Sequence, residues 1–411
     1  IGRAGRFIGA FTNNNRGGNA TGSVNESFSF NYTLENILNY SKKFKDVHNL
    51  NVTALQSIQQ DKFETTNISV NGIPAETQSY NRLGDASQIT GANTNLTEWT
   101  LLSYMGRLNY DYKEKYLLTA TVRMDGSSRF GFDNRWGAFP SVSLGWRVSE
   151  ENFMKNVNWL SDLKVKASYG ITGNNFISNY GAIALTTADN YIFGASGGTV
   201  NNGIRLNNIG NSLLGWEKNK QLDLGLEFGV LQNRMFMSVD YYNKRTSDLL
   251  LSVPVPTLTG YTNALQNIGE IQNKGFEFTV TSRNLVKEFK WTTDMNFSTN
   301  GIKVLALGPD GSRILARQLT FAAGNTHVTE IGSAPGSFFG YKVIGIYQNQ
   351  NEIDTQPIVK NANGTAFSKP GQLKFADVNG DGVITADDRT IIGDPFPDFT
   401  YGMTNSFAYK G

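Results

Sequence analysis

The sequence predicts an all-β fold: a transmembrane antiparallel β-barrel with long extracellular loops. Three observations carry this prediction. Apolar and polar residues alternate over long runs, the connections between these runs are alternately short and long, and the composition is rich in aromatic residues and glycine, with 17 Tyr, 26 Phe and 43 Gly. Barrel strands alternate lipid-facing and lumen-facing side chains, and aromatic residues form girdles at both membrane interfaces.

Composition excludes several other classes of protein. The chain has 37 basic and 35 acidic residues, a net charge of +2 and no basic run, so nothing indicates a nucleic-acid partner. It has no cysteine and only two histidines, His48 and His327, which argues against disulfides, thiolate sites and histidine-built metal centres. No apolar run approaches the ~18 residues of a transmembrane helix. A helical membrane protein is therefore excluded, whereas a barrel is not.

Strands are predicted where apolar residues recur at every second position. In the run 98–112, for example, Leu108 lies on the apolar face and Arg107 on the polar one. The next run, 115–126, follows after a tight turn, so the two make a hairpin. We predict about twelve strands of the kind that barrels use, and in chain order they are 2–12, 24–41, 47–60, 98–112, 115–126, 137–148, 161–171, 219–231, 234–246, 272–283, 288–300 and 399–410.

The lengths of the connections favour a barrel over a soluble β-sandwich. Sandwich strands also alternate, because one face packs on a core, but a sandwich has no reason to sort its loops by side. Outer-membrane barrels have short periplasmic turns and long extracellular loops. The predicted short connections are Ser41–Asp46, Lys113–Glu114, Leu231–Asn233 and Asn284–Lys287, and the long ones are 61–97, 172–218, 246–271 and 301–398.

The last long connection, 301–398, carries a stretch with the ligand spacing of a calcium loop, residues 377–388 (DVNGDGVITADD). An EF-hand-type loop supplies oxygen ligands from positions 1, 3, 5, 7 and 12. Gly382 at position 6 allows the sharp turn, and Ile384 at position 8 ties the loop to its surroundings. The predicted calcium ligands are the side chains of Asp377, Asn379, Asp381 and Asp388 and the carbonyl of Val383.

This loop departs from an EF-hand in two ways. Position 12 is Asp rather than Glu, as in dockerin-like loops, and no helical pattern precedes Asp377. The alternative interpretation is an Asx-rich turn that binds no metal. A bound calcium ion is expected to be structural, because a cage of protein oxygens with no open position orders a long loop better than it supports chemistry.

Several motifs distributed over the whole chain resemble one family in their order and spacing. They are Asp125-Gly-Ser-Ser-Arg-Phe130, Arg135-Trp-Gly137, Phe139–Arg147, Ser168–Asn174, Leu214–Glu217, Asn267–Glu277, Pro335–Tyr341, Gly345–Tyr347, the calcium-like loop and Gly393–Phe399. The chain resembles the barrel half of the SusC/RagA-type TonB-dependent transporters of Bacteroidetes outer membranes. The resemblance implies a barrel of about 22 strands closed by an N-terminal plug. The plug, the TonB box and about ten strands are then expected outside these residues, in a longer polypeptide.

The resemblance also implies a function. It predicts an active importer of oligosaccharides or peptides in the bacterial outer membrane, energised through TonB and covered by a SusD-like surface lipoprotein. In such a barrel the charged residues of the polar face would contact the plug or the solute, and their ordinary role is a solvated wall. These inward residues are Arg107, Arg123, Arg147, Lys164, Asp223, Glu227, Glu277 and Asp294. Loop aromatics that could stack on sugars, or simply pack the loops together, are Trp216, Phe338, Phe339, Tyr341 and Tyr347.

No enzymatic activity is expected. The motif 125–130 places Ser beside Asp and Arg, but no His or Lys base is near in sequence, and Asp-Gly with a Ser pair is ordinary turn chemistry, with Arg129 directed inward. No nucleotide-binding fingerprint occurs. Two alternative functions remain open: a passive porin-like channel, which the same fold permits, and a secreted calcium-stabilised β-protein that binds or hydrolyses glycans.

Overall fold

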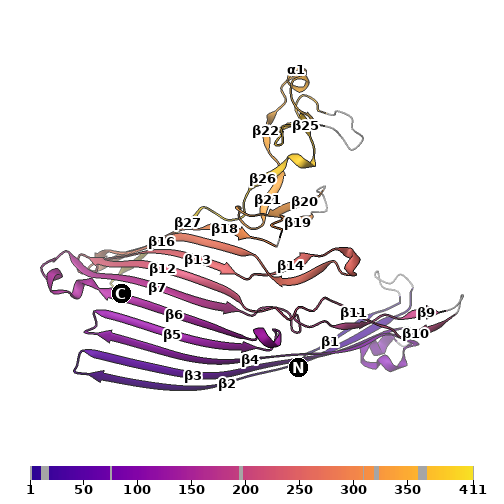
Figure 1. Ribbon diagram of the computed structural model, residues 1–411, viewed down its shortest axis with the longest axis horizontal. Helices are drawn as coiled ribbons and strands as arrows, with labels where there is room; N and C mark the ends of the chain where they lie inside the picture. Colours follow the sequence, from indigo (N-terminus) through magenta and orange to yellow (C-terminus); the bar gives the residue numbers. More distant parts are fainter. Residues whose placement is uncertain are drawn as a thin grey trace.

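The computed structural model describes residues 2–10, 18–74, 76–193, 198–308, 310–318, 324–359 and 368–410. One antiparallel sheet of 13 strands dominates it, and the predicted all-β antiparallel fold is confirmed (Figure 1). Strands that follow one another in the main path are neighbours in the sheet, because antiparallel neighbours need no crossover connection. The main path is β1 (Gly2–Ile8), β2 (Thr21–Phe44), β3 (His48–Asn71), β4 (Gln88–Tyr112), β5 (Tyr116–Ser127), β6 (Trp136–Arg147), β7 (Leu160–Asn174), β12 (Glu217–Val230), β13 (Met235–Ser247), β16 (Glu270–Val286), β17 (Phe289–Thr299) and β27 (Phe399–Tyr409), with β18 (Gly301–Ala306) beside β16.

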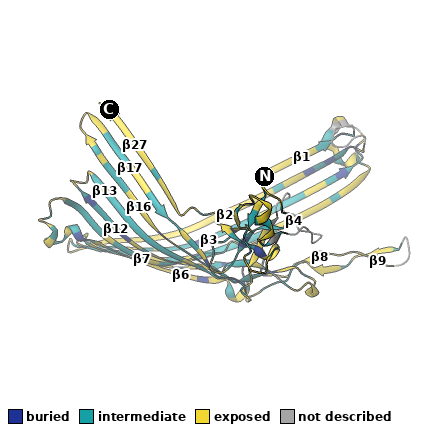
Figure 2. Cartoon of the chain, turned by 90° about the horizontal axis from the view of Figure 1, so that it is seen from above, coloured by how far each residue is buried: buried dark blue, intermediate teal, exposed yellow. Residues whose placement is uncertain are grey.

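The sheet is strongly curved. Seen from above, β1–β4 form one wall and β12–β27 form another, with β6 and β7 between them (Figure 2). Adjacent strands are rotated relative to one another by the right-handed twist of each strand, so a sheet of this width curls. Within the described residues, β1 pairs with β2 and β27 pairs with β17, and they do not pair with each other.

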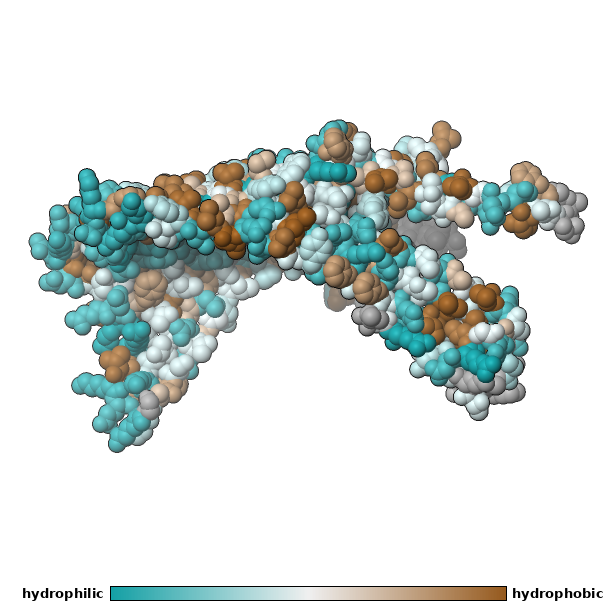
Figure 3. Space-filling model, turned by 90° about the horizontal axis from the view of Figure 1, so that it is seen from below, coloured by the Kyte–Doolittle hydropathy of each residue, from teal (hydrophilic) through white to brown (hydrophobic). Residues whose placement is uncertain are grey.

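One face of the sheet is apolar and the other is polar, because side chains alternate along each strand. On β6, Val142 and Leu144 are 42% and 55% exposed, and their neighbours on β7, Tyr169 and Ala167, continue the same row. Large apolar side chains at this exposure are stabilised where they contact lipid. Seen from below, apolar side chains gather in patches over the sheet, and hydrophilic ones gather at its left end (Figure 3).

Tight turns close the strands at one end of the sheet. Lys113 and Glu114 have φ of 55° and 57°, and Lys45 and Asp46 have φ of 48° and 55°. Two successive left-handed residues form the type I′ turn, whose twist matches that of the flanking strands. The predicted short connections are confirmed as short, but two of them are displaced: β2 continues to Phe44, and β16 continues to Val286, so most of the predicted connection Asn284–Lys287 is strand.

The prediction of a long loop over 61–97 is wrong for most of that range. β3 continues to Asn71 and β4 begins at Gln88, so only 72–87 connects them, including the 3₁₀ segment η1 (Glu76–Asp85). These extensions contain polar runs such as 64–67 (ETTN). Apolar alternation therefore stops before the backbone ladder does. At the N-terminus, β1 ends at Ile8, and residues 11 and 12 of the predicted first strand lie outside the described residues.

The longer connections contain further structure at the opposite end of the sheet from the tight turns. A small core fixes two of them: Phe130 and Trp216 are buried, with ring centroids 5.2 Å apart, and Phe139 meets Trp216 edge to face at 5.1 Å. The additional elements are η2 (Phe132–Asn134), β8 (Thr186–Ala188), β9 (Tyr191–Phe193), β10 (Thr199–Asn201), β11 (Ile204–Leu206), β14 (Leu250–Pro254), η5 (Thr257–Thr259) and β15 (Asn263–Asn267). Two further 3₁₀ turns lie between β6 and β7, η3 (Val148–Glu150) and η4 (Asn152–Met154).

Residues 314–393 form a separate small unit, here called the loop module, above the main sheet in Figure 1. Its centre is the four-stranded sheet β19–β20–β21–β26. No helix in the described ranges is long and apolar enough to cross a membrane. The elements of the module are β19 (Ile314–Gln318), β20 (Asn325–Thr329), β21 (Ser337–Tyr341), β22 (Val343–Ile346), α1 (Gln350–Asp354), β23 (Ile358–Val359), β24 (Leu373–Phe375), β25 (Val383–Ile384), η6 (Ala386–Asp388) and β26 (Arg389–Gly393).

Candidate functional site

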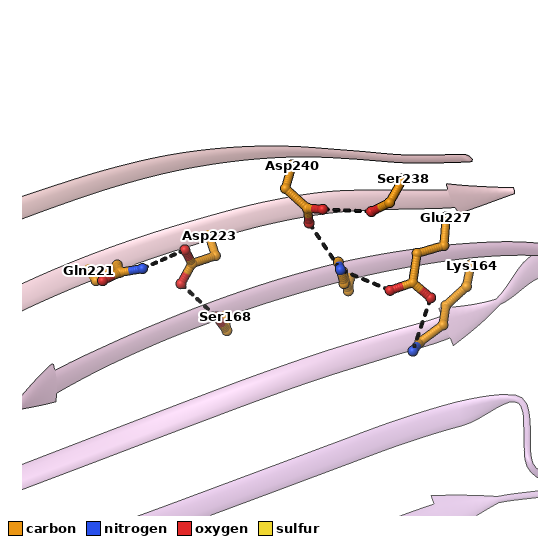
Figure 4. A network of polar contacts seen from close by, with 8 residues as sticks. Lys164, Ser168, Gln221, Asp223, Glu227, Ser238 and Asp240 are labelled. Carbon is orange, nitrogen blue, oxygen red and sulfur yellow. Dashed lines mark hydrogen bonds and ion pairs between the residues drawn. The ribbon is translucent and has the colours of Figure 1, made fainter. Parts of the chain in front are cut away.

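The polar face of the sheet carries a network of charged side chains on β7, β12 and β13 (Figure 4). Lys166 is its centre: its Nζ lies 2.8 Å from Glu227 Oε1 and 3.0 Å from Asp240 Oδ1. Glu227 also meets Lys164 at 3.5 Å. The four residues share a face because the register pairs Lys164 with Glu227 and places Gly225 between Lys166 and Asp240. One lysine therefore bridges three strands.

Glycine at position 225 makes this bridge possible. A Cβ built on Gly225 would lie 2.1 Å from Lys166 Cε and 2.3 Å from Asp240 Oδ1, so any larger residue would occupy the path of the lysine side chain. Two aspartates on this face also accept hydrogen bonds from uncharged groups. Asp223 accepts hydrogen bonds from Ser168 Oγ at 3.1 Å and Gln221 Nε2 at 2.7 Å. Ser238 Oγ donates to Asp240 at 2.6 Å.

A polar groove of about 570 Å³ lies along this network. Its floor includes Asp223, Asp240 and Glu277, together with Tyr242 and Lys244. Asp240 and Glu277 are directly opposite one another on β13 and β16, where like charges repel. The groove therefore presents both signs of charge to whatever passes along this face.

The predicted inward residues lie on the polar face, but the structure brings only some of them together. Lys164, Glu227, Asp223 and Glu277 belong to the network or its groove. The remaining four have local partners elsewhere: Arg107 with Thr121, Arg123 with Asp125, Arg147 with Glu150 and Asp294 with Thr281.

Sequence reasoning missed Lys166 and Asp240, the two residues that complete the bridge. Lys166 has the same parity as Lys164, which was the available signal. The register between β7, β12 and β13, which brings Lys166 to Asp240, is not visible in the sequence.

The motif 125–130 is a structural junction. The single N–H of Arg123 Nε is shared between the two oxygens of Asp125, each at 2.8 Å, and Ser127, fully buried, accepts a hydrogen bond from Asn175 Nδ2 at 3.1 Å. The Arg129 guanidinium stacks 4.5 Å from the Trp99 ring and donates to Asn179 Oδ1 at 3.0 Å. Ser127 and Arg129 thus tie the connection after β7 to this end of the sheet, which is a structural role.

The Asp-rich loop of the loop module is folded by its own side chains. Asp377 accepts hydrogen bonds from the amides of Gly380 at 2.7 Å and Gly382 at 2.8 Å. Asn379 Oδ1 accepts from the Asp381 amide at 3.0 Å, and Asp381 Oδ1 accepts from the Val383 amide at 2.8 Å. Gly380 and Gly382 have φ of 76° and 81°, which a side chain would strain. The side chains at positions 1, 3 and 5 of the loop therefore each accept hydrogen bonds from backbone amides of the loop itself.

Asp388 closes the loop from its other end. It is fully buried, and it accepts hydrogen bonds from the amides of Val378 at 2.9 Å and Thr385 at 2.7 Å. Burial alone would raise its pKa, but these amide donors outweigh burial and hold the pKa of Asp388 below its ordinary value. The next residue, Arg389, begins β26 and stacks 4.8 Å from the buried Phe339 ring of β21. The loop is thus continuous with the sheet of the module.

The donor set of this loop fits a hard cation, because it consists of carboxylate, amide and carbonyl oxygens. The described residues nevertheless contain no group of three or more His, Asp or Glu side chains gathered as a metal-binding cluster. Asp377, Asp381 and Asp388 are each engaged by backbone amides instead. Ile384 at position 8 is buried and belongs to β25, which pairs with β23, as its predicted anchoring role requires.

The five loop aromatics differ in accessibility. Trp216, Phe339 and Tyr347 are buried, so they pack loops together rather than receive a solute. Phe338 and Tyr341 are 40% and 37% exposed and remain able to meet a ring from solvent. Burial of a whole aromatic side chain is set by tertiary packing, which the sequence does not reveal.

The curved antiparallel sheet, its apolar outer face and its charged opposite face define an outer-membrane β-barrel protein. The chain belongs to the TonB-dependent receptor-like β-barrel family, whose sequence model matches residues 3–371.

Individual relatives place it more closely. The chain is 39% identical over 379 residues to TonB-dependent receptor P3 of Formosa agariphila, covering 92% of this chain and 37% of that protein. It is 37% identical over 323 residues to the TonB-dependent receptor SusC of Bacteroides thetaiotaomicron, covering 76% of this chain and 30% of SusC. It superposes on the RagAB peptide transporter with a TM-score of 0.73 and 26% identity, covering 96% of this chain and 41% of that one. The predicted SusC/RagA-type resemblance is confirmed, and the chain spans less than half the length of these relatives.

Proposed function

We propose that this chain forms part of the barrel of an active outer-membrane importer that takes up oligosaccharides or peptides. Energy would arrive through TonB, and a SusD-like surface lipoprotein would deliver the solute at the end that carries the long loops. The family and the relatives, which are named receptors and transporters, support transport rather than catalysis. The peptide transporter among the structural neighbours supports a peptide as one candidate solute, and the similarity to SusC keeps a glycan as the other.

The observation that carries this proposal is the charged face of the sheet. Lys164, Lys166, Glu227 and Asp240 form a connected network on β7, β12 and β13, opposite an apolar face that suits lipid. A polar lumen and a lipid-facing exterior are what a barrel that conducts hydrophilic solutes needs. The groove carries both acidic and basic side chains, so it can form ion pairs with a plug. Such solvent-exposed pairs are weak enough to be broken when the plug is released.

Purification from outer membranes tests the proposal. Detergent extraction of the full-length protein, followed by mass spectrometry, is expected to recover a longer chain together with a surface lipoprotein. Uptake of labelled oligosaccharides and peptides by cells should then be lost when TonB is deleted. Uptake that persists without TonB would instead support the passive channel, and a protein that is soluble without detergent would support the secreted β-protein.

We also propose that loop 377–388 binds Ca²⁺ as a structural ion. The side chains of Asp377, Asn379 and Asp381 turn into the same loop, and Asp388 closes it, as the spacing of a calcium loop requires. Calcium would draw these carboxylates together and so hold η6 and β26 in place. The ion has no part in moving the solute in this proposal.

Hydrogen exchange of the full-length protein tests calcium binding directly. Residues 373–393 are expected to exchange more slowly with added Ca²⁺ than with a chelator, and Asp381→Ala should abolish the difference. Asp354→Asn, which changes an exposed acid of the same module on α1, serves as the matched control and should leave it intact. Identical exchange with and without calcium in the unaltered protein would favour the Asx-rich turn.

A further inference from the structure

The connection between β6 and β7, residues 148–159, differs from the other connections at its end of the sheet. It is not a tight turn but contains η3 and η4. The Arg147 amide donates to the carbonyl of Lys115 at 2.8 Å, so the connection starts beside the tight turn that joins β4 to β5. Its position is therefore the rim of the sheet at the short-turn end, where outer-membrane barrels meet the periplasm.

Glu151 attaches this connection to the apolar face. Its carboxylate accepts hydrogen bonds from Tyr116 Oη at 2.6 Å, Lys115 Nζ at 3.1 Å and Trp146 Nε1 at 3.2 Å. Tyr116 and Trp146 are directly opposite each other on β5 and β6, and they are 46% and 39% exposed. The connection therefore folds back toward the lipid-facing side rather than toward the polar face.

The residues that Glu151 contacts belong to an aromatic belt. The Tyr112 ring lies 6.3 Å from the Tyr116 ring and 4.8 Å from the His48 ring. Rings with one apolar and one polar edge collect at the level of the lipid headgroups, where both edges are satisfied. The belt thus marks the membrane interface at this end of the sheet.

The connection itself presents the chemistry of an interface. Phe153 and Trp159 are 65% and 64% exposed, and Leu231, whose amide donates to the Trp159 carbonyl at 3.1 Å, is 60% exposed. Both acids of the connection are neutralised by cations: Glu150 by Arg147 at 3.3 Å and Glu151 by Lys115 at 3.1 Å. Lys155 is exposed and has no ion pair among the described residues. Exposed rings, a free cation and no unpaired acid suit an anionic lipid surface.

We propose that residues 148–159, with Leu231, form an interfacial anchor that lies in the headgroup region of the phospholipid leaflet at the short-turn end, held against the barrel by Glu151. The partner is anionic phospholipid, because the anchor continues the lipid-facing belt and leaves only Lys155 unpaired. The anchor adds a membrane contact beyond the strands and depends on the outer-membrane location of the barrel, not on what the barrel transports.

Site-specific labelling tests the anchor. These 411 residues contain no cysteine, so single cysteines can be introduced into a cysteine-free full-length chain as Phe153→Cys or Trp159→Cys. After reconstitution into nanodiscs of phosphatidylethanolamine and phosphatidylglycerol, an environment-sensitive fluorophore at either position should emit at shorter wavelength and be quenched by nitroxide lipids. Leu144→Cys, on the apolar face, gives the lipid reference. Leu258→Cys, apolar but 99% exposed in a connection at the opposite end, gives the water reference.

Two outcomes decide the proposal. Labels at 153 and 159 that resemble the label at 144 in quenching by nitroxide lipids support it, and labels as open to aqueous iodide as the one at 258 overturn it. Glu151→Ala should then reduce lipid quenching at position 153, while the heat-modified gel mobility of a folded barrel is retained. Unchanged quenching in this folded variant would contradict the role of Glu151.

Discussion

Two acidic regions of this molecule are held together in different ways. On the polar face, Glu227 and Asp240 bind the side chain of Lys166, whereas in the loop module Asp377 and Asp388 bind backbone amides. The backbone explains the contrast. Strands of a sheet satisfy their N–H and C=O groups in the ladder, while an irregular loop leaves amides that need other acceptors. A carboxylate on the polar face can thus be replaced without disturbing the backbone, whereas a carboxylate in the loop holds the backbone in its fold.

The largest expected effect is that of Asp388→Ala. The substitution removes the acceptor of the Val378 and Thr385 amides, and each buried amide left without a partner costs about 1–3 kcal/mol. Residues 373–393 should lose protection in hydrogen exchange, while the strands of the main sheet keep theirs. Asp387→Ala changes the exposed neighbour and is the control. Full protection in the Asp388 variant would show that the loop is held by other contacts.

The second largest effect is expected from acidification, which should destabilise the loop module through Asp388. The pKa of Asp388 is lower in the folded protein than in the unfolded chain, where an Asp has a pKa of about 3.9. Its stabilisation is therefore complete above that pH and is lost as the pH falls through the lower, folded pKa. The protection of the loop module, which is its hydrogen exchange corrected for the pH dependence of the intrinsic amide exchange rate, should decrease only below about pH 4. Loss of protection already near pH 6 would point to a different group.

The sequence predicted the part of the fold in which side chains themselves carry the pattern. Strands such as β5 and β12 were found because lipid and lumen impose opposite chemistry on alternate residues. Beyond the lipid that demand ends, so the alternation predicts a loop where the polar extensions of β3 and β4 continue the ladder. Strand pairing is made by backbone N–H and C=O groups, which almost every residue has, so the sequence does not show where the pairing ends.

The candidate sites show the same division. The Asp-rich loop could be located in the sequence because all its members lie within 377–388, and local spacing fixes their geometry. The network on the polar face joins residues about 60 to 75 positions apart, which only the sheet register brings together. Lys164 and Glu227 could be assigned to the correct face, but the bridge through Lys166 could not.

Removing the central lysine should have a smaller effect than removing Asp388. Lys166→Met deletes both ion pairs but keeps the apolar stem, and the side chain is 35% exposed. Pairs this open to solvent are worth at most about 1 kcal/mol each, so the free energy of unfolding should fall only modestly. Urea unfolding in liposomes, followed by tryptophan fluorescence, measures the loss.

Lys244→Met is the matched control for this change. Lys244 lines the same groove but has no ion pair among the described residues, so its replacement should leave stability unchanged. Salt provides a second check, because added NaCl should reduce the difference between the unaltered protein and the Lys166 variant. A loss as large as that of Asp388→Ala would mean that the polar face is organised by buried rather than screened interactions.

The smallest expected effect, and the most specific, is that of Gly225→Ala. The new methyl would lie 2.1 Å from Lys166 Cε, so the lysine must leave its path between Glu227 and Asp240. Against that loss, replacing glycine restricts the unfolded chain, which stabilises a protein by about 0.4–1 kcal/mol where the backbone tolerates it. The net change in unfolding free energy is therefore near zero, and the information lies in its coupling to Lys166.

A double-mutant cycle of Gly225→Ala with Lys166→Met isolates that coupling. Once the ion pairs are gone, the Asp240 carboxylate and the flexible side chain at 166 are both free to move away from the methyl, so the two changes together should cost less than their sum. Gly106→Ala, where an added Cβ has nothing within 4 Å, should be additive with Lys166→Met. Additivity at both glycines would show that the bridge across β12 does not depend on the absence of a side chain at 225. The contrast between the polar face, where carboxylates can be replaced, and the loop, where they hold the backbone, would then rest on the Asp388 and Lys166 variants alone.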